Sequence, residues 1–169
     1  ILFLFPTPSK SNMVNVHSLS TTLAQRGHEV TVVSPFPLNK EIQNHREIFI
    51  PLSEKFSKEQ EELFNTKSKL FFKAFQVYTD VYPKMVINMT KTPQFQQILN
   101  EKFDLLVIGM TFTNFLLGYG QHFNCPTAML SVQRHTSFTN YPIGSPLAVS
   151  AVSNVFYPIK QFNFLNRVL

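Results

Sequence analysis

The chain of 169 residues is long enough for one domain with a substantial hydrophobic core. Hydrophobic residues make up 44% of it and charged residues only 15%, which excludes an intrinsically disordered chain. The net charge of +5 is scattered and lacks the basic-aromatic pattern of nucleic-acid readers, so we expect no nucleic-acid partner.

The first stretch of the chain predicts a buried strand and then a helix. Residues 1–5, ILFLF, form an apolar run typical of strands in parallel sheets. The helix is expected over residues 13–26, where three apolar residues recur at helical spacing: Val16, Leu19 and Leu23. Gly27 follows and suits the C-terminal cap of this helix.

Two further strands are expected next. Residues 29–35, EVTVVSP, are rich in β-branched residues and end at a proline. Together with the preceding strand and helix they predict a right-handed βαβ unit. We expect a third strand over residues 46–50, REIFI.

The middle of the chain predicts a helical insertion. Residues 54–90 are rich in helix formers, lack glycine and predict two or three helices, one of which Pro83 breaks or starts. Residues 92–102 predict a further short helix. Large apolar residues recur at three- and four-residue steps in the insertion: Leu70, Phe71, Phe72, Phe75, Tyr78 and Tyr82. Side chains in such a pattern usually pack in a hydrophobic core. Some of them can also line a pocket for an apolar ligand.

The following part repeats the strand, helix and strand pattern. Strands are expected over residues 103–109 and 126–132, with a helix over 113–123 between them. Cys125 is the single cysteine, which excludes an internal disulfide, and its place before an apolar run favours a buried structural thiol. A loop from residue 133 and a final helix over 158–169 complete the chain.

These elements predict an α/β fold with a mostly parallel sheet and a helical insertion. No linker or shift in composition divides the chain, so we expect one domain over residues 1–169. The loop over residues 5–12, FPTPSKSN, joins the first strand to the first helix, where an α/β protein holds its ligand. No GxGxxG, GxxxxGK[ST] or HExxH motif occurs, so nothing supports a dinucleotide, P-loop or metal site.

Three features bear on the cellular route. No apolar run approaches the roughly 18 residues of a membrane span. The chain starts on an apolar stretch without Met, which fits a mature chain whose signal peptide is gone or an excised part of a longer chain. NMT, residues 88–90, is an N-glycosylation sequon, which makes Asn88 a candidate glycosylation site.

Three stretches occur in a characteristic order. They are FPTPSKSN with RGHEVTVVSPFP at residues 5–37, FDLLVIG with FTNFLLGYGQHFNCPTAMLS at residues 103–131, and IGSPLAVSAVSNVFYPIKQFNFLNRVL at residues 143–169. In these stretches the chain resembles the UDP-glucuronosyltransferase family, and most closely its insect UDP-glycosyltransferase members. The resemblance covers essentially the whole chain but only the N-terminal half of the family.

The resemblance implies a GT-B fold of two Rossmann-like halves, of which this chain is the N-terminal, acceptor-binding one. The C-terminal half, absent here, holds most of the UDP-sugar, which is a co-substrate, so no cofactor is implied. The implied partners are a small lipophilic acceptor, a UDP-sugar and, as a possibility left open, a second copy of the chain. The implied location is the lumenal side of the endoplasmic reticulum, reached through a C-terminal membrane anchor, with a role in detoxification.

In the family a histidine after the first strand takes the proton of the acceptor, and a carboxylate after a later strand orients it. The histidine position falls on Asn12 and the carboxylate position on Gly109, so no catalytic residue of this pair is intact. Asn12 then suits a helix N-cap, and Gly109 a turn or a close backbone approach. His17 is expected on the partly exposed surface of the helix and is unsuited to replace the base.

The resemblance also implies which residues line the acceptor site: Ser11, Asn12, Phe71, Phe75 and Phe112. Two functions remain open. The chain is either part of a UDP-glycosyltransferase that transfers a sugar with inversion to lipophilic acceptors, or a catalytically impaired homologue that binds such molecules without sugar transfer.

Overall fold

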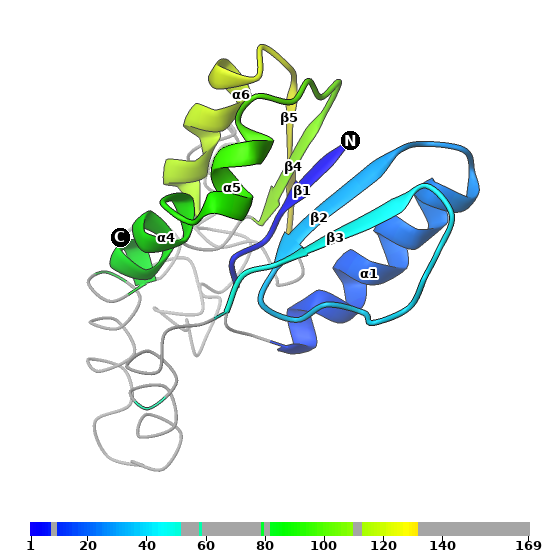
Figure 1. The fold of residues 1–169 in the computed structure, drawn as a ribbon, viewed down its shortest axis with the longest axis horizontal. Helices are drawn as coiled ribbons and strands as arrows, with labels where there is room; N and C mark the ends of the chain where they lie inside the picture. The colour runs from blue at the N-terminus through cyan, green and yellow to red at the C-terminus, as the bar shows by residue number, and fades with distance from the viewer. Residues whose placement is uncertain (8–9, 52–57, 59–78, 80–81, 110–112, 132–169) are drawn as a thin grey trace, which may run out of the picture. The chain divides into compact units, whose positions relative to one another are not determined.

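The computed structural model describes residues 1–7, 10–51, 58, 79, 82–109 and 113–131 (Figure 1). The chain divides into two units, Ile1–Leu130 and Ser131–Leu169, and apart from Ser131 the described residues all belong to the first. The predicted loop from residue 133, the helix over 158–169 and nearly all of the insertion before residue 82 lie outside the described residues. The expectation of one domain over the whole chain stays a prediction.

A parallel sheet forms the centre of the first unit. Its strands are β1 (Leu2–Leu4), β2 (Val30–Ser34), β3 (His45–Phe49), β4 (Leu106–Gly109) and β5 (Thr127–Leu130). They lie in the order β3-β2-β1-β4-β5, and all four neighbouring pairs are parallel. The predicted α/β fold with a Rossmann-like parallel sheet is therefore confirmed, and every strand predicted for this part of the chain is present.

The helices of the described part are α1 (Lys10–Gln25), α4 (Tyr82–Thr90), α5 (Pro93–Ile98), the 3-10 helix η2 (Asn114–Leu117) and α6 (Gly118–His122). Pro83 lies in the first turn of α4, as expected of a proline that starts a helix. The helix predicted over 113–123 is instead the 3-10 helix η2 followed by the short α-helix α6, which begins at Gly118.

The two faces of the sheet have separate hydrophobic cores. On one face, Phe3, Phe5 and Val107 of the sheet region pack with Met13 and Val16 of α1. On the other face, alternate residues of the same strands pack with α4, α5 and η2; these buried residues include Leu2, Leu4, Ile108, Tyr82, Phe95, Ile98 and Leu116. Figure 1 shows α1 apart from the group formed by α4, α5 and α6. The unit is therefore layered helix, sheet, helix.

The end of α1 is fixed by Gly27, as the sequence predicts. Gly27 has a φ of 92°, in the left-handed region that favours glycine. Its N–H donates to the carbonyl of Ala24 at 3.0 Å, and the N–H of His28 donates to the carbonyl of Leu23 at 3.2 Å. This pair of bonds is a Schellman motif, which satisfies carbonyls at the end of the helix and turns the chain into β2.

Replacement of this glycine tests the cap. The substitution Gly27→Ala should lower the free energy of unfolding by about 1 kcal/mol, because a side chain disfavours a positive φ even though nothing lies within 4 Å of the added Cβ. Gly118→Ala is the matched control, since Gly118 also has open space around it but a helical φ of −58°. Urea unfolding that gives the same change for both variants would contradict this account of the cap.

Candidate active-site edge

The carboxyl ends of β1 and β4 define the candidate site. The two strands are neighbours, with Leu4 paired to Ile108, and the direction in which successive strands are added reverses between them. A ligand of an open parallel sheet binds outside the carboxyl ends of the strands at such a switch point. The segment from Phe5 to α1 and the segment that follows Gly109 both begin at this edge.

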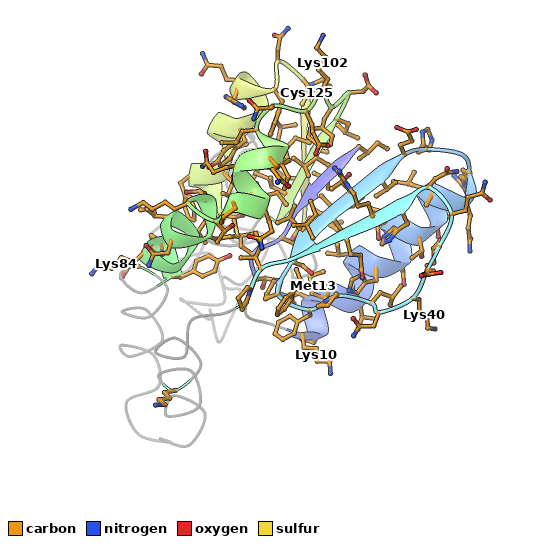
Figure 2. All side chains as sticks on the ribbon, viewed as in Figure 1. Lys10, Met13, Lys40, Lys84, Lys102 and Cys125 are labelled. Carbon is orange, nitrogen blue, oxygen red and sulfur yellow. The ribbon has the colours of Figure 1, made fainter. Side chains whose placement is uncertain are left out.

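Figure 2 shows the two ends of the sheet. Lys10 and Met13 lie at the end where α1 begins, and Lys102 and Cys125 lie at the opposite end. Cys125 is half-buried, and burial raises the pKa of its thiol. A thiol that is harder to ionise and distant from the carboxyl edge agrees with the structural role predicted for it.

Asn12 lies inside α1, not at its cap. The helix begins at Lys10, so Asn12 is in the first turn and the prediction of an N-cap was wrong. The polar residues around Asn12 matched a cap, but the helix starts before the apolar periodicity becomes visible. The Asn12 side chain is partly buried, and the neighbouring Ser11 is exposed. An amide side chain at this position donates and accepts hydrogen bonds but has no useful basicity.

Gly109 ends β4 without any steric need for glycine. Its φ is outside the left-handed region, and a Cβ built on it would lie 3.4 Å from Phe5 Cε1 and 3.7 Å from Thr113 Oγ1. These are ordinary van der Waals distances to side-chain atoms, so no close backbone approach requires glycine here. The predicted turn would involve residues 110–112, which lie outside the described residues. The Thr113 hydroxyl donates to the Gly109 carbonyl and is buried. A Cβ at this position therefore makes only ordinary contacts with the described residues.

Other predicted site residues are placed only in part. Phe71, Phe75 and Phe112 lie outside the described residues, so their role in an acceptor site stays a prediction. Asn88 is exposed on α4, between the buried Val86 and Met89 of the same helix. Its side chain therefore points away from the core.

A polar hollow of about 830 Å³ lies at the other end of the sheet. Its lining includes Glu29, His45, Arg46, Glu101 and Asp104, which lie at or near the amino-terminal ends of the strands. It does not coincide with the edge where a parallel sheet binds its ligand. Its polar lining also differs from the apolar pocket that a lipophilic acceptor requires.

His17 is more buried than the sequence indicates. It was expected on a partly exposed helix surface, but its side chain is only 12% exposed. Its Nε2 donates to the Phe36 carbonyl at 2.9 Å, since a carbonyl oxygen can only accept, and its Nδ1 lies 3.4 Å from Glu47 Oε1. With both ring nitrogens directed at these partners, His17 is not placed to act as the missing base.

A polar cluster that the sequence did not reveal surrounds His17, and we call it the His17 cluster: His17, Ser20, His45 and Glu47. Glu47 Oε2 accepts from the backbone N–H of Leu38 at 2.6 Å. Ser20 Oγ lies 3.0 Å from His45 Nε2 and donates to the His17 carbonyl at 3.2 Å. The cluster joins α1, β3 and the connection between β2 and β3.

A pattern in the sequence could have indicated this cluster. His17 and Ser20 are three residues apart in a helix, so they share a face. His45 and Glu47 are two residues apart in a strand, so their side chains lie on the same face of that strand. What the pattern does not supply is that these two faces meet, because β3 could lie at either edge of the sheet.

Two absences concern the described residues alone. Among them, no three His, Cys, Asp or Glu side chains are grouped closely enough to hold a metal ion. None of the helices in the described ranges is both long and apolar enough to cross a bilayer.

The cluster makes stability depend on pH through His45. Burial lowers the pKa of His45 from the ordinary value of 6.5, and His17 lowers it further, whereas Glu47 raises it. Below pH 6.5 the unfolded chain therefore binds more protons at His45 than the folded chain does. The contribution of neutral His45 to the free energy of unfolding is complete above that pH and is lost as the pH falls. His45→Gln should therefore flatten the loss of unfolding free energy between about pH 7.5 and 5.5. His28→Gln, at an exposed histidine, is the control, and an equal slope in wild type and His45→Gln would contradict the assignment.

Comparison with known proteins finds three similar insect proteins. The chain is 30% identical over its whole length to UDP-glycosyltransferase UGT4 of the insect Dactylopius coccus. It is 29% identical over 99% of its length to UDP-glycosyltransferase UGT5 of the same insect. It is also 29% identical over its whole length to UDP-glucosyltransferase 2 of that insect. It spans about a third of the length of these curated relatives, between 33% and 34%. No family model and no solved structure matches the chain. The chain, with its Rossmann-like parallel sheet, is therefore similar over its own length to about one third of these insect UDP-glycosyltransferases.

Proposed function

We propose that this chain is the acceptor-binding half of a UDP-glycosyltransferase of GT-B fold. The observation that carries the proposal is the similarity of the whole chain to one third of each relative. The parallel sheet supports it, because its switch point offers a binding edge between β1 and β4. A second half of the protein would then supply the UDP-sugar, and this chain would hold a small lipophilic hydroxyl compound.

Sugar transfer to a hydroxyl needs a group that removes the proton of the acceptor. A base acts only within hydrogen-bond reach of that proton, and its orienting partner must lie beside it. Asn12 and Gly109 occupy the two positions that the family uses for this pair, both at the carboxyl edge. Neither can bind or orient a proton, so these two residues provide no base catalysis.

A second function is favoured by the same two positions. In this alternative the protein binds lipophilic small molecules and transfers no sugar. Gly109 supports it, because a Cβ there would make only ordinary contacts, so those contacts do not force glycine in place of a carboxylate residue. Acceptors with acidic protons, such as phenols, need less help from a base, so the two functions differ most for aliphatic alcohols.

The cellular setting belongs to the same proposal. A UDP-glycosyltransferase of this family is expected at the lumenal side of the endoplasmic reticulum, held by a C-terminal anchor, and homo-oligomers are left open. The described residues bear on this only through Asn88, whose exposure suits a glycan on a lumenal face.

Restoration of the pair tests the catalytic part. In the two-domain protein, Asn12→His combined with Gly109→Asp should raise kcat/KM for 1-octanol with UDP-glucose by about 100-fold or more, the usual contribution of general base catalysis. The matched control is Asn15→His with Gly109→Asp, which adds a histidine to an exposed position of α1 nearby. If the unmodified protein already equals an active relative on 1-octanol, the impaired function is wrong.

Asn88 tests the secretory part. When the protein is produced through a eukaryotic secretory pathway, we expect a glycan on Asn88, because the sequon asparagine is exposed and a glycan there displaces no core residue. Peptide N-glycosidase should increase the electrophoretic mobility of the wild type, and Asn88→Gln should lose that shift if no other sequon is used. Asn100→Gln, at an exposed asparagine without a sequon, is the control; no shift in the wild type would count against a lumenal location.

A further inference from the structure

We propose that His17 and Glu47 are positioning residues that hold the segment Phe36–Asn39 in place as a wall of the acceptor site. The inference rests on the proposed function, since it names the residues that shape that site. The segment follows β2 at the carboxyl edge of the sheet, next to β1. The two residues come from elements on either side of it, α1 and β3.

Glu47 holds the segment through its backbone. One carboxylate oxygen, Oε2, accepts from the N–H of Leu38 at 2.6 Å and lies 3.4 Å from the N–H of Asn39. Asn39 has a φ of 54°, in the left-handed region. Two successive N–H groups directed at one anion form a nest, which is a conformation that the backbone adopts around negative charge. The loop geometry and the Glu47 charge therefore support each other.

His17 holds the start of the same segment. Its Nε2–H donates to the Phe36 carbonyl at 2.9 Å. Its Nδ1 and Glu47 Oε1 lie 3.4 Å apart, and neither of these buried atoms has another hydrogen-bond partner in the described part of the chain. When both ring nitrogens carry a proton, the two side chains form an ion pair that satisfies both atoms at once. Two side chains thus fix three backbone groups within four residues.

The segment connects to both family positions through the core. Phe36 packs against the cluster that contains Phe5 and Met13. Phe5 lies against Gly109, and Met13 follows Asn12 in α1. A shift of the segment would therefore move Phe5 and Met13, the core residues next to Gly109 and Asn12. Such a shift changes ligand affinity while the central strands keep their pairing.

Variants separate positioning from general stability. Glu47→Gln removes the charge while keeping the shape, and Glu41→Gln is its matched control at an exposed position of the same connection. His17→Ala removes the donor to Phe36, whereas His17→Gln keeps an N–H donor of similar reach. A merely packed histidine would not be rescued by glutamine.

Two measurements on the two-domain protein decide the matter. Amide hydrogen exchange reports the segment, and titration with 1-naphthol reports the site. For Glu47→Gln and His17→Ala we expect at least about fivefold faster exchange at Leu38 and Asn39, unchanged exchange in β1, and about fivefold weaker binding of 1-naphthol, in line with the loss of one charge-assisted hydrogen bond. Glu41→Gln should match the wild type, and His17→Gln should lie close to it.

The outcomes are distinguishable. Faster exchange with weaker binding supports the positioning role. Unchanged exchange at Leu38 and Asn39 in Glu47→Gln, or faster exchange with unchanged affinity, overturns it while the proposed function stands. Failure of the wild type to bind 1-naphthol overturns the proposed function and, with it, the role of the segment as a wall.

Discussion

The pairing of β1 on both of its sides is the constraint on which the rest of the structure depends. Leu2, Phe3 and Leu4 are fully buried, and the strand pairs in parallel with β2 and with β4. Burial of each such side chain contributes roughly 1.5–3 kcal/mol. Because alternate side chains point to opposite faces, the same three residues feed both cores. β1 is also the strand at which the direction of strand addition reverses, because β2 and β3 are added on one side of it and β4 and β5 on the other.

The candidate site follows from that constraint. The segment that leaves β1 leads to Asn12 in α1, and Gly109 is the last residue of β4 at the same edge. The Rossmann-like sheet is present, and under our proposal Asn12 and Gly109 stand at the positions of the histidine and the carboxylate. Gly109 is informative here, since a Cβ built on it would make only ordinary van der Waals contacts with Phe5 and Thr113. These contacts alone do not require glycine at the end of β4.

The sequence predicted the strands and α1 well, because apolar runs and helical spacing are local signals. The residue-level interpretations at the site fared less well. Asn12 was assigned to a helix cap but lies in the first turn of α1, and no close backbone approach explains Gly109. Helix boundaries and the need for glycine depend on backbone angles that composition does not reveal. The environment of His17 was also misjudged, since its partner Glu47 is thirty residues away in the sequence.

The sequence by itself determined the α/β class, the family resemblance and the identity of Asn12 and Gly109 at the positions that the resemblance compares with a histidine and a carboxylate. Those conclusions rest on residue identity and on periodicity, which a linear chain carries in full. Only the tertiary structure decided the strand order, the contacts of Gly109 with Phe5 and Thr113, and the burial of His17 against Glu47. The physical reason is that each of these depends on which faces meet, and faces meet only when the strands have taken their places in the sheet.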